Sequence, residues 1–171
     1  MTRTLVVVRH AKAEQSHPQG DYARELAPRG VADAQELGRW LAEEDLLPDL
    51  VLSSPAARAR QTTEQLLAGA GVPDVEVWGG RGLYDGGAAR VLEAVREVPD
   101  DVTTLWVVGH QPVMGIVTAA LADPQASDRR SVDAVEDHFP TASCAVLTTD
   151  VAWEALQAGQ ARLVAFRTAR A

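Results

Sequence analysis

The sequence predicts an α/β fold: a three-layer α/β/α sandwich around a mostly parallel, six-stranded sheet with one antiparallel strand. Short apolar runs alternate with longer segments of helical apolar spacing, and this β-α-β-α order is typical of a parallel sheet covered by helices on both faces. The last two strand-like runs have no helix between them, so we expect a hairpin that supplies the antiparallel strand. No linker or repeat divides the 171 residues, and we predict a single domain over residues 1–171.

The individual elements follow from apolar spacing and from the Pro and Gly residues at their ends. Thr4–Val8 is a continuous run of strand formers, the pattern of a strand buried on both faces. Pro28 suits the first turn of a helix over residues 28–45, although Ala27 before it offers no side-chain cap. We further expect strands at 49–54, 75–78, 103–110, 143–149 and 161–168. Helices are expected at 88–98, at 112–121 and from 55 to a glycine at 69 or 71. A Gly-rich loop is expected at 79–87 and a polar flap or lid at 123–140.

Composition argues against several classes of function. Twenty-four acidic and sixteen basic residues give a formal charge of -8, which disfavours nucleic acid and anionic membranes as partners. The longest nearly apolar stretch, residues 113–122, is too short to span a bilayer, and the N-terminal apolar run is too short for a signal peptide. The single cysteine, Cys144, excludes an internal disulfide. We therefore expect a cytoplasmic protein with neither nucleic acid nor membrane as partner, and a monomer by default.

Three of the predicted strands end in residues that bind anions or transfer groups. The first ends in Arg9 and His10, Arg58 follows the second, and the fourth ends in His110. Because the carboxyl ends of parallel strands meet at one edge of a sheet, we expect these four side chains to converge. Guanidinium groups suit phosphate oxygens, and two adjacent arginines repel a metal ion, so the cluster predicts a phosphate site without a metal. A single Arg or His at such a position is more often structural. The prediction depends on finding these residues at the ends of three different strands.

The motifs at these strand ends resemble those of the histidine phosphatase superfamily, also called the phosphoglycerate mutase-like family. They are RHA after the first strand, SSPAARARQT after the second and VVGHQPVMG after the fourth, with ELAPRG between the first two. The short chain and the variant RHAKAE make it most similar to the SixA-type phosphohistidine phosphatases. Two positions depart from the family pattern: Ala11 stands where Gly is familiar, and Ala27 stands where Ser or Thr commonly caps the helix.

The resemblance implies a phosphoglycerate mutase-like fold and a metal-independent phosphatase without a cofactor. It implies that His10 is the nucleophile and that Arg9, Arg58 and His110 complete the phosphate site. A neutral imidazole attacks phosphorus in line, and water then hydrolyses the phosphohistidine intermediate. The two arginines and a protonated His110 would stabilise the charge of the transition state. Many family members place a carboxylic acid after the third strand, which makes Asp85 the candidate proton donor, although Asp-Gly is also a common turn pair.

The sequence leaves the substrate open. The leading hypothesis is dephosphorylation of phosphohistidine in a signalling or carrier protein. The alternatives are a phosphomonoesterase acting on a small metabolite, such as a sugar phosphate or nucleotide, and a non-catalytic module that binds phosphorylated partners. Since the N–P bond is labile, a poorly placed acid at Asp85 would favour phosphoramidates over phosphomonoesters. Candidate rim residues are Ser16, Arg24 and Gln111, and Ser53 is a candidate to orient the nucleophile.

Overall fold

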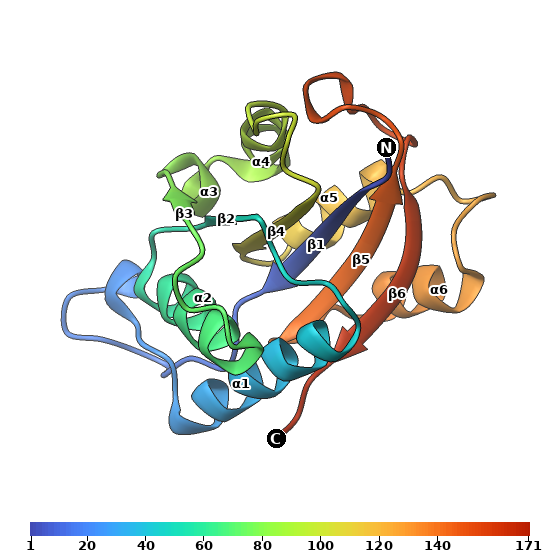
Figure 1. Ribbon diagram of the computed structural model, residues 1–171. Coiled ribbons are helices and arrows are strands. Elements are labelled where there is room, and N and C mark those ends of the chain that lie inside the picture. The colour runs from blue at the N-terminus through green and yellow to red at the C-terminus, as the bar shows by residue number, and fades with distance from the viewer.

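A computed structural model describes all 171 residues and shows one six-stranded sheet between two layers of helices (Figure 1). The strands are β1 (Arg3–Arg9), β2 (Leu50–Ser53), β3 (Val77–Gly79), β4 (Thr104–Gly109), β5 (Ser143–Thr149) and β6 (Arg162–Thr168). The helices are α1 (Pro28–Glu43), α2 (Ala57–Ala70), α3 (Gly82–Asp85), α4 (Gly87–Arg96), α5 (Val113–Leu121) and α6 (Arg129–Asp137), with 3₁₀ turns η1 (Asp21–Ala23) and η2 (Trp153–Ala155).

The strand order and directions confirm the predicted sheet. The order is β3-β2-β4-β1-β5-β6, and the first four of these strands pair in parallel. Strand β5 is antiparallel to both of its neighbours, β1 and β6, so the two final strands form the expected hairpin. Helix α2 ends at Gly71, whose φ of 77° is the left-handed conformation that favours glycine at a helix end. No helix combines the length and the apolar character needed to cross a membrane.

Two segments predicted as irregular contain helices. The Gly-rich loop 79–87 includes the short helix α3, and the polar segment 123–140, predicted as a flap or lid, includes α6. The side chain of Asp128 caps α6 by accepting a hydrogen bond from the Ser131 amide at 2.9 Å. Helix α6 packs against β6 and α5 through its two valines, Val132 and Val135. The segment therefore belongs to the helical layer, and its apolar stripe is too narrow to be found by periodicity.

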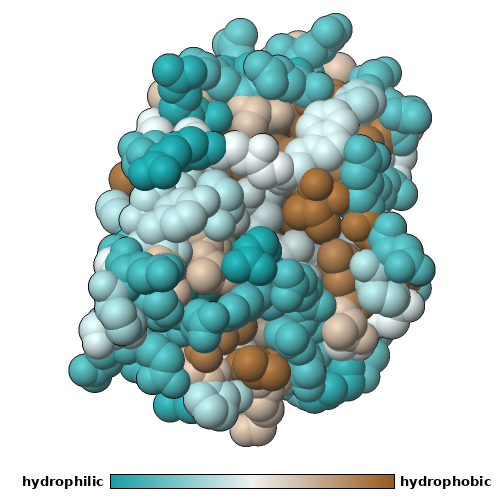
Figure 2. Space-filling model, turned by 90° about the vertical axis from the view of Figure 1, so that its left-hand side faces the viewer, coloured by the Kyte–Doolittle hydropathy of each residue, from teal (hydrophilic) through white to brown (hydrophobic).

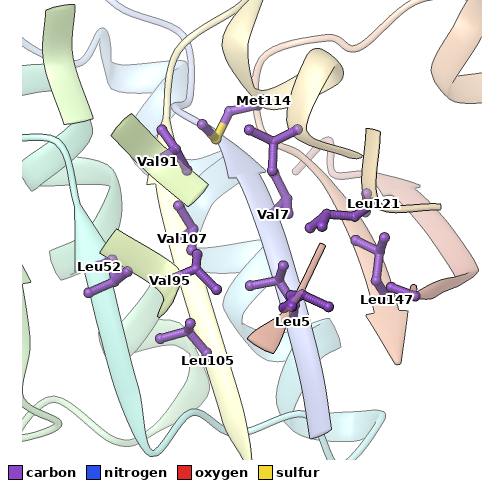
Figure 3. Packing of buried hydrophobic residues seen from close by; sticks show 14 of the residues in the cluster. Leu5, Val7, Leu52, Val91, Val95, Leu105, Val107, Met114, Leu121 and Leu147 are labelled. Carbon is purple, nitrogen blue, oxygen red and sulfur yellow. The ribbon is translucent and has the colours of Figure 1, made fainter. Parts of the chain in front are cut away.

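Strand β1 lies at the centre of the sheet and contributes to two hydrophobic cores. Leu5 and Val7 pack with α4 and α5 in the core that Figure 3 shows. Val6 and Val8 point to the opposite face and pack with α1 and α2. All four side chains are at most 2% exposed, and burying each aliphatic side chain stabilises the fold by about 1.5–3 kcal/mol. The residues that follow β1 are therefore held at a fixed place on the edge of the sheet.

Helices α1 and α2 approach each other to backbone contact. A Cβ atom on Gly38 would lie 2.1 Å from the carbonyl oxygen of Leu66, and one on Gly69 would lie 2.2 Å from that of Gln35. No side chain fits at either position, so the two glycines permit this close packing. Arg58 lies in the first turn of α2, and the packing of α2 against α1 helps to fix its backbone.

Candidate active site

The four residues predicted from the strand ends converge at the carboxyl edge of the sheet. The rings of His10 and His110 have centroids 5.2 Å apart. His10 and Arg58 are 7% and 6% exposed, so both lie inside the protein. Burial lowers the pKa of His10, and the nearby charges of Arg58 and Arg9 lower it further. The structure thus brings together the groups that β1, β4 and the start of α2 carry.

One ring nitrogen of His10 is engaged by the backbone and the other is left free. Its Nδ1 lies 2.8 Å from the carbonyl oxygen of Ala11. Because a carbonyl oxygen only accepts, Nδ1 carries the proton and Nε2 keeps its lone pair. Burial, followed by the nearby positive charges, lowers the pKa of His10 to about 3, so the ring is neutral at pH 7. The backbone is fixed as well, since the His10 amide donates to the carbonyl oxygen of Gly109 at 3.0 Å.

His110 is oriented by Ser54, which the sequence did not single out. The distance between His110 Nε2 and Ser54 Oγ is 2.8 Å, and Ser54 Oγ also accepts from the Ala56 amide at 3.3 Å. When the hydroxyl donates to Nε2, Nδ1 carries the proton of the neutral ring. Burial and the charge of Arg58 lower the pKa of His110 to about 4. Protonation of both nitrogens at pH 7 therefore requires an anion beside the ring.

Three buried donors in this cluster have no hydrogen-bond partner in the protein: Nε of Arg9, Nε of Arg58 and Nδ1 of His110. One terminal nitrogen of Arg9 and both of Arg58 are engaged, because Arg9 Nη1 donates to the carbonyl oxygen of Phe139 at 3.0 Å and Arg58 donates to Asp21. A buried donor without a partner is costly. An oxyanion bound beside His10 would give these donors a partner.

Asp85, the candidate proton donor, makes no hydrogen bond or ion pair with either histidine. It is exposed at the end of α3, and its side chain binds Arg81, with Nε and Oδ2 separated by 3.3 Å. It makes no hydrogen bond or ion pair with another side chain. The adjacent residue, Tyr84, faces the site instead: its ring centroid lies 5.5 Å from that of His110. The role predicted for Asp85 stays a prediction.

The candidate rim residues have different surroundings. Arg24 lies beside the site, because its Nε binds Oδ1 of Asp21 at 3.0 Å. Ser16 is exposed and makes no side-chain hydrogen bond. The side-chain oxygen of Gln111 accepts from the Gly115 amide at 2.7 Å in the first turn of α5. Ser53 is buried and bonds to Thr63 and to the Ser54 carbonyl, so Ser54 and not Ser53 contacts a site histidine.

Sequence reasoning also missed a carboxylate, Asp21, which lies in η1 on the loop before α1. Its Oδ2 accepts from Arg58 Nη2 at 3.1 Å and from the Tyr84 hydroxyl at 2.7 Å. In the sequence, only the neighbouring Gly20 pointed to a turn at this place. In the structure Gly20 has a φ of 96°, which favours glycine. Figure 2 looks onto the side of the molecule where this loop and α3 lie, and that face is mostly hydrophilic with small apolar patches.

Comparison with known proteins agrees with this geometry. The family model of the histidine phosphatase superfamily (branch 1) matches residues 5–80. An uncharacterized protein of Mycobacterium tuberculosis is 38% identical over 165 residues, which cover 95% of this chain and 100% of that protein. A solved structure from Nakamurella multipartitia, named for the phosphohistidine phosphatase SixA, is 35% identical and has a TM-score of 0.86, with 100% of this chain and 98% of that chain covered.

Two further matches extend the comparison. A structure from Agrobacterium tumefaciens that also has a SixA name is 27% identical, with a TM-score of 0.78 and coverage of 96% of this chain and 97% of that chain. A 2,3-bisphosphoglycerate-dependent phosphoglycerate mutase of Clavibacter michiganensis is 35% identical over 82 residues, which are 44% of this chain and 33% of the mutase. The fold is phosphoglycerate mutase-like, and the protein belongs to the histidine phosphatase superfamily as a phosphatase enzyme.

Proposed function

We propose that this phosphatase works without a metal, carries the phosphoryl group on His10, and acts on phosphohistidine in a protein. The observation that carries the proposal is the arrangement around His10: a neutral ring with a free Nε2, beside three buried donors that have no partner in the protein. These are the parts that in-line attack on a phosphoryl group needs. The guanidinium groups next to both histidines also oppose the binding of a metal cation.

In the first step, His10 Nε2 attacks the phosphorus atom. The new N–P bond forms as the bond to the leaving group breaks, and the bonding electron pair goes to the leaving atom. The Nε–H groups of Arg9 and Arg58 and the Nδ1–H group of His110 donate to the phosphoryl oxygens, whose charge is spread in the transition state. The dianionic phosphoryl group favours the protonated form of His110, whose pKa is otherwise depressed.

In the second step, water attacks the phosphohistidine at His10. The N–P bond breaks, inorganic phosphate leaves, and the electron pair returns to Nε2, so that the neutral ring is restored. The Nδ1 hydrogen bond to the Ala11 carbonyl keeps the same tautomer through both steps. One phosphorylated substrate and one water molecule therefore yield the dephosphorylated substrate and one phosphate.

The choice of substrate class follows from the carboxylates near the site. An alkoxide leaving group needs a proton donor, whereas the imidazole of phosphohistidine leaves more readily. Asp85 binds Arg81 on the exposed end of α3. Asp21 is a poor acid, because the hydrogen bond from Tyr84, together with the charges of Arg58 and Arg24, lowers its pKa to about 2. The absence of a ready acid favours a phosphoramidate over the small phosphomonoesters that we considered as an alternative.

The test is phosphate release by the wild type and by His10→Ala. Both proteins are assayed with p-nitrophenyl phosphate, with phosphoramidate and with a phosphohistidine peptide. We expect the wild type to prefer the two N–P substrates in kcat/KM, and His10→Ala to lose at least about 1,000-fold on all three. Equal activities of the two proteins would refute the enzyme mechanism and leave the binding-module hypothesis. A preference of the wild type for p-nitrophenyl phosphate would favour the metabolite phosphatase.

A further inference from the structure

Asp21 is the one acidic residue that contacts the proposed phosphate-binding groups. Its backbone oxygen accepts from Arg58 Nη1 at 2.8 Å, and its Oδ2 accepts from Arg58 Nη2 at 3.1 Å. Neither the family model nor the names of the relatives assign a role to it. A carboxylate at this place could either compete with the phosphoryl group for Arg58 or hold Arg58 for it, and the geometry of the guanidinium distinguishes these two roles.

A guanidinium has five N–H donors arranged along defined edges of a planar group. Asp21 accepts one hydrogen bond from each terminal nitrogen of Arg58, so it binds the end of the group that is remote from Nε. The Nε–H lies on the side edge, and Nε is buried without a partner in the protein. An oxyanion bound to the side edge satisfies that donor without displacing Asp21.

Asp21 is itself fixed from two other directions. Arg24 Nε donates to its Oδ1 at 3.0 Å, and the Tyr84 hydroxyl donates to its Oδ2 at 2.7 Å. The hydrogen bond from Tyr84 and the two arginines hold the pKa of Asp21 at about 2, so its charge is constant over the working pH range. A permanent anion with three separate partners is suited to holding a guanidinium in one orientation.

We propose that Asp21 is a positioning residue that locks Arg58 with its side edge turned toward the phosphoryl group. This inference rests on the proposed function for the identity of the bound group. Asp21 touches neither the nucleophile nor the phosphoryl group and acts only through Arg58. Through Arg24 and Tyr84 it also ties the orientation of Arg58 to the loop before α1 and to α3.

The experiment compares Asp21→Asn with the wild type and with Asp133→Asn. Asp133 is a matched control, because its side chain is 57% exposed against 55% for Asp21 and also binds an arginine, Arg129, at 3.0 Å on the surface of α6. Binding of tungstate is measured by calorimetry, and kcat and KM are measured with phosphoramidate. We expect Asp21→Asn to lose about 10- to 100-fold in tungstate affinity and in kcat/KM, and Asp133→Asn to match the wild type in both.

A double-mutant cycle with Arg58 tests the route of the effect. Because Asp21 acts through Arg58, Asp21→Asn should cause no further loss in an Arg58→Ala background. Arg58→Gln replaces Arg58→Ala if that variant does not fold, and thermal unfolding checks each protein. Unchanged or tighter tungstate binding by Asp21→Asn would overturn the inference, and so would an equal loss in both backgrounds. If the wild type hydrolyses no substrate while tungstate binding still depends on Asp21, the proposed function fails and the inference stands.

Discussion

The floor of the site and its rim are built differently. The floor, which we define as His10, Ser54, Arg58 and His110, is held by backbone atoms and by one buried hydroxyl, except that Arg58 also bonds to the carboxylate of Asp21. The rim, which we define as Asp21, Arg24, Arg81 and Tyr84, is held by contacts between side chains that are at least partly exposed. Backbone positions survive most substitutions, whereas contacts between side chains depend on both partners. We therefore expect substitutions in the floor to affect the proposed chemistry, and substitutions in the rim to affect the orientation of Arg58 and the choice of substrate.

The rim also brings aromatic rings next to the floor. The Tyr22 and Tyr84 ring centroids are 5.1 Å apart in an edge-to-face arrangement, and the Arg81 guanidinium lies 5.3 Å from the centroid of Tyr22. Tyr84 in turn contacts His110. A cation over an aromatic ring contributes about 0.5–1 kcal/mol at an exposed site. The rim is therefore a set of weak, separable contacts, and single substitutions there should change the enzyme less than substitutions in the floor.

The largest effect is expected from the floor. In the proposed mechanism His110→Ala removes a donor to the phosphoryl group, and the loss of one such donor costs about 100- to 1,000-fold in kcat. Steady-state kinetics with phosphoramidate measure this loss. Ser54→Ala is the informative companion, because it keeps the ring and removes only the hydroxyl that orients it. We expect Ser54→Ala to lose less than His110→Ala, and a loss from His110→Ala of under about tenfold would contradict its place among the phosphoryl donors.

A second effect of the floor is a dependence of stability on pH. His10 has a folded pKa of about 3, below the usual value of 6.5, because burial disfavours the charged ring. Between these two values the unfolded chain binds a proton that the folded chain does not, so stability falls as the pH decreases below about 6.5. The free energy of unfolding should decrease between pH 7 and pH 5 in both proteins. The decrease should be up to about 2 kcal/mol larger in the wild type than in His10→Gln.

Urea unfolding at pH 7, 6 and 5 measures this difference. The comparison with His10→Gln cancels the carboxylates, which titrate in both proteins. Parallel pH profiles of the two proteins would show that His10 is not buried as a neutral ring. An added oxyanion should stabilise the wild type at each pH, since it binds the folded state alone.

Most residues of the floor could be predicted from the sequence, whereas most of those in the rim could not. Arg9, His10 and His110 follow directly from strand ends, because a parallel sheet places its carboxyl ends at one edge. Arg58 follows from its place just after β2. Ser54 was missed by one position: Ser53 and Ser54 are chemically alike, and only the local direction of the backbone decides which hydroxyl reaches His110.

The rim could not be predicted for a physical reason. Asp21 and Tyr84 are 63 positions apart and meet through side chains on an irregular loop and a four-residue helix, neither of which has a periodic pattern. The helix α6 was missed on similar grounds, since its stripe contains only Val132 and Val135. Helices and strands can be located in a sequence because their apolar residues recur at a regular spacing. Contacts between loops depend on the tertiary packing of the whole chain.

The smallest effect is expected at Asp85, on the outer side of α3. Its side chain binds Arg81 and contacts no group of the floor. If the natural leaving group is an imidazole, removing this carboxylate leaves the first step unchanged. Asp85→Asn should then keep kcat/KM within about twofold of the wild type with phosphoramidate, the range of an ordinary surface substitution.

The same variant with p-nitrophenyl phosphate and with an alkyl phosphate separates the two substrate classes. An alkyl phosphate has a poor leaving group and depends most on a proton donor. A loss of about 100-fold on the alkyl phosphate, with phosphoramidate unaffected, would support Asp85 as the proton donor and would favour the metabolite phosphatase. Equal rates of wild type and Asp85→Asn on all three substrates would show that Asp85 takes no part in the reaction and only pairs with Arg81. The proposed cleavage of an N–P bond, which needs no strong acid, would then stand.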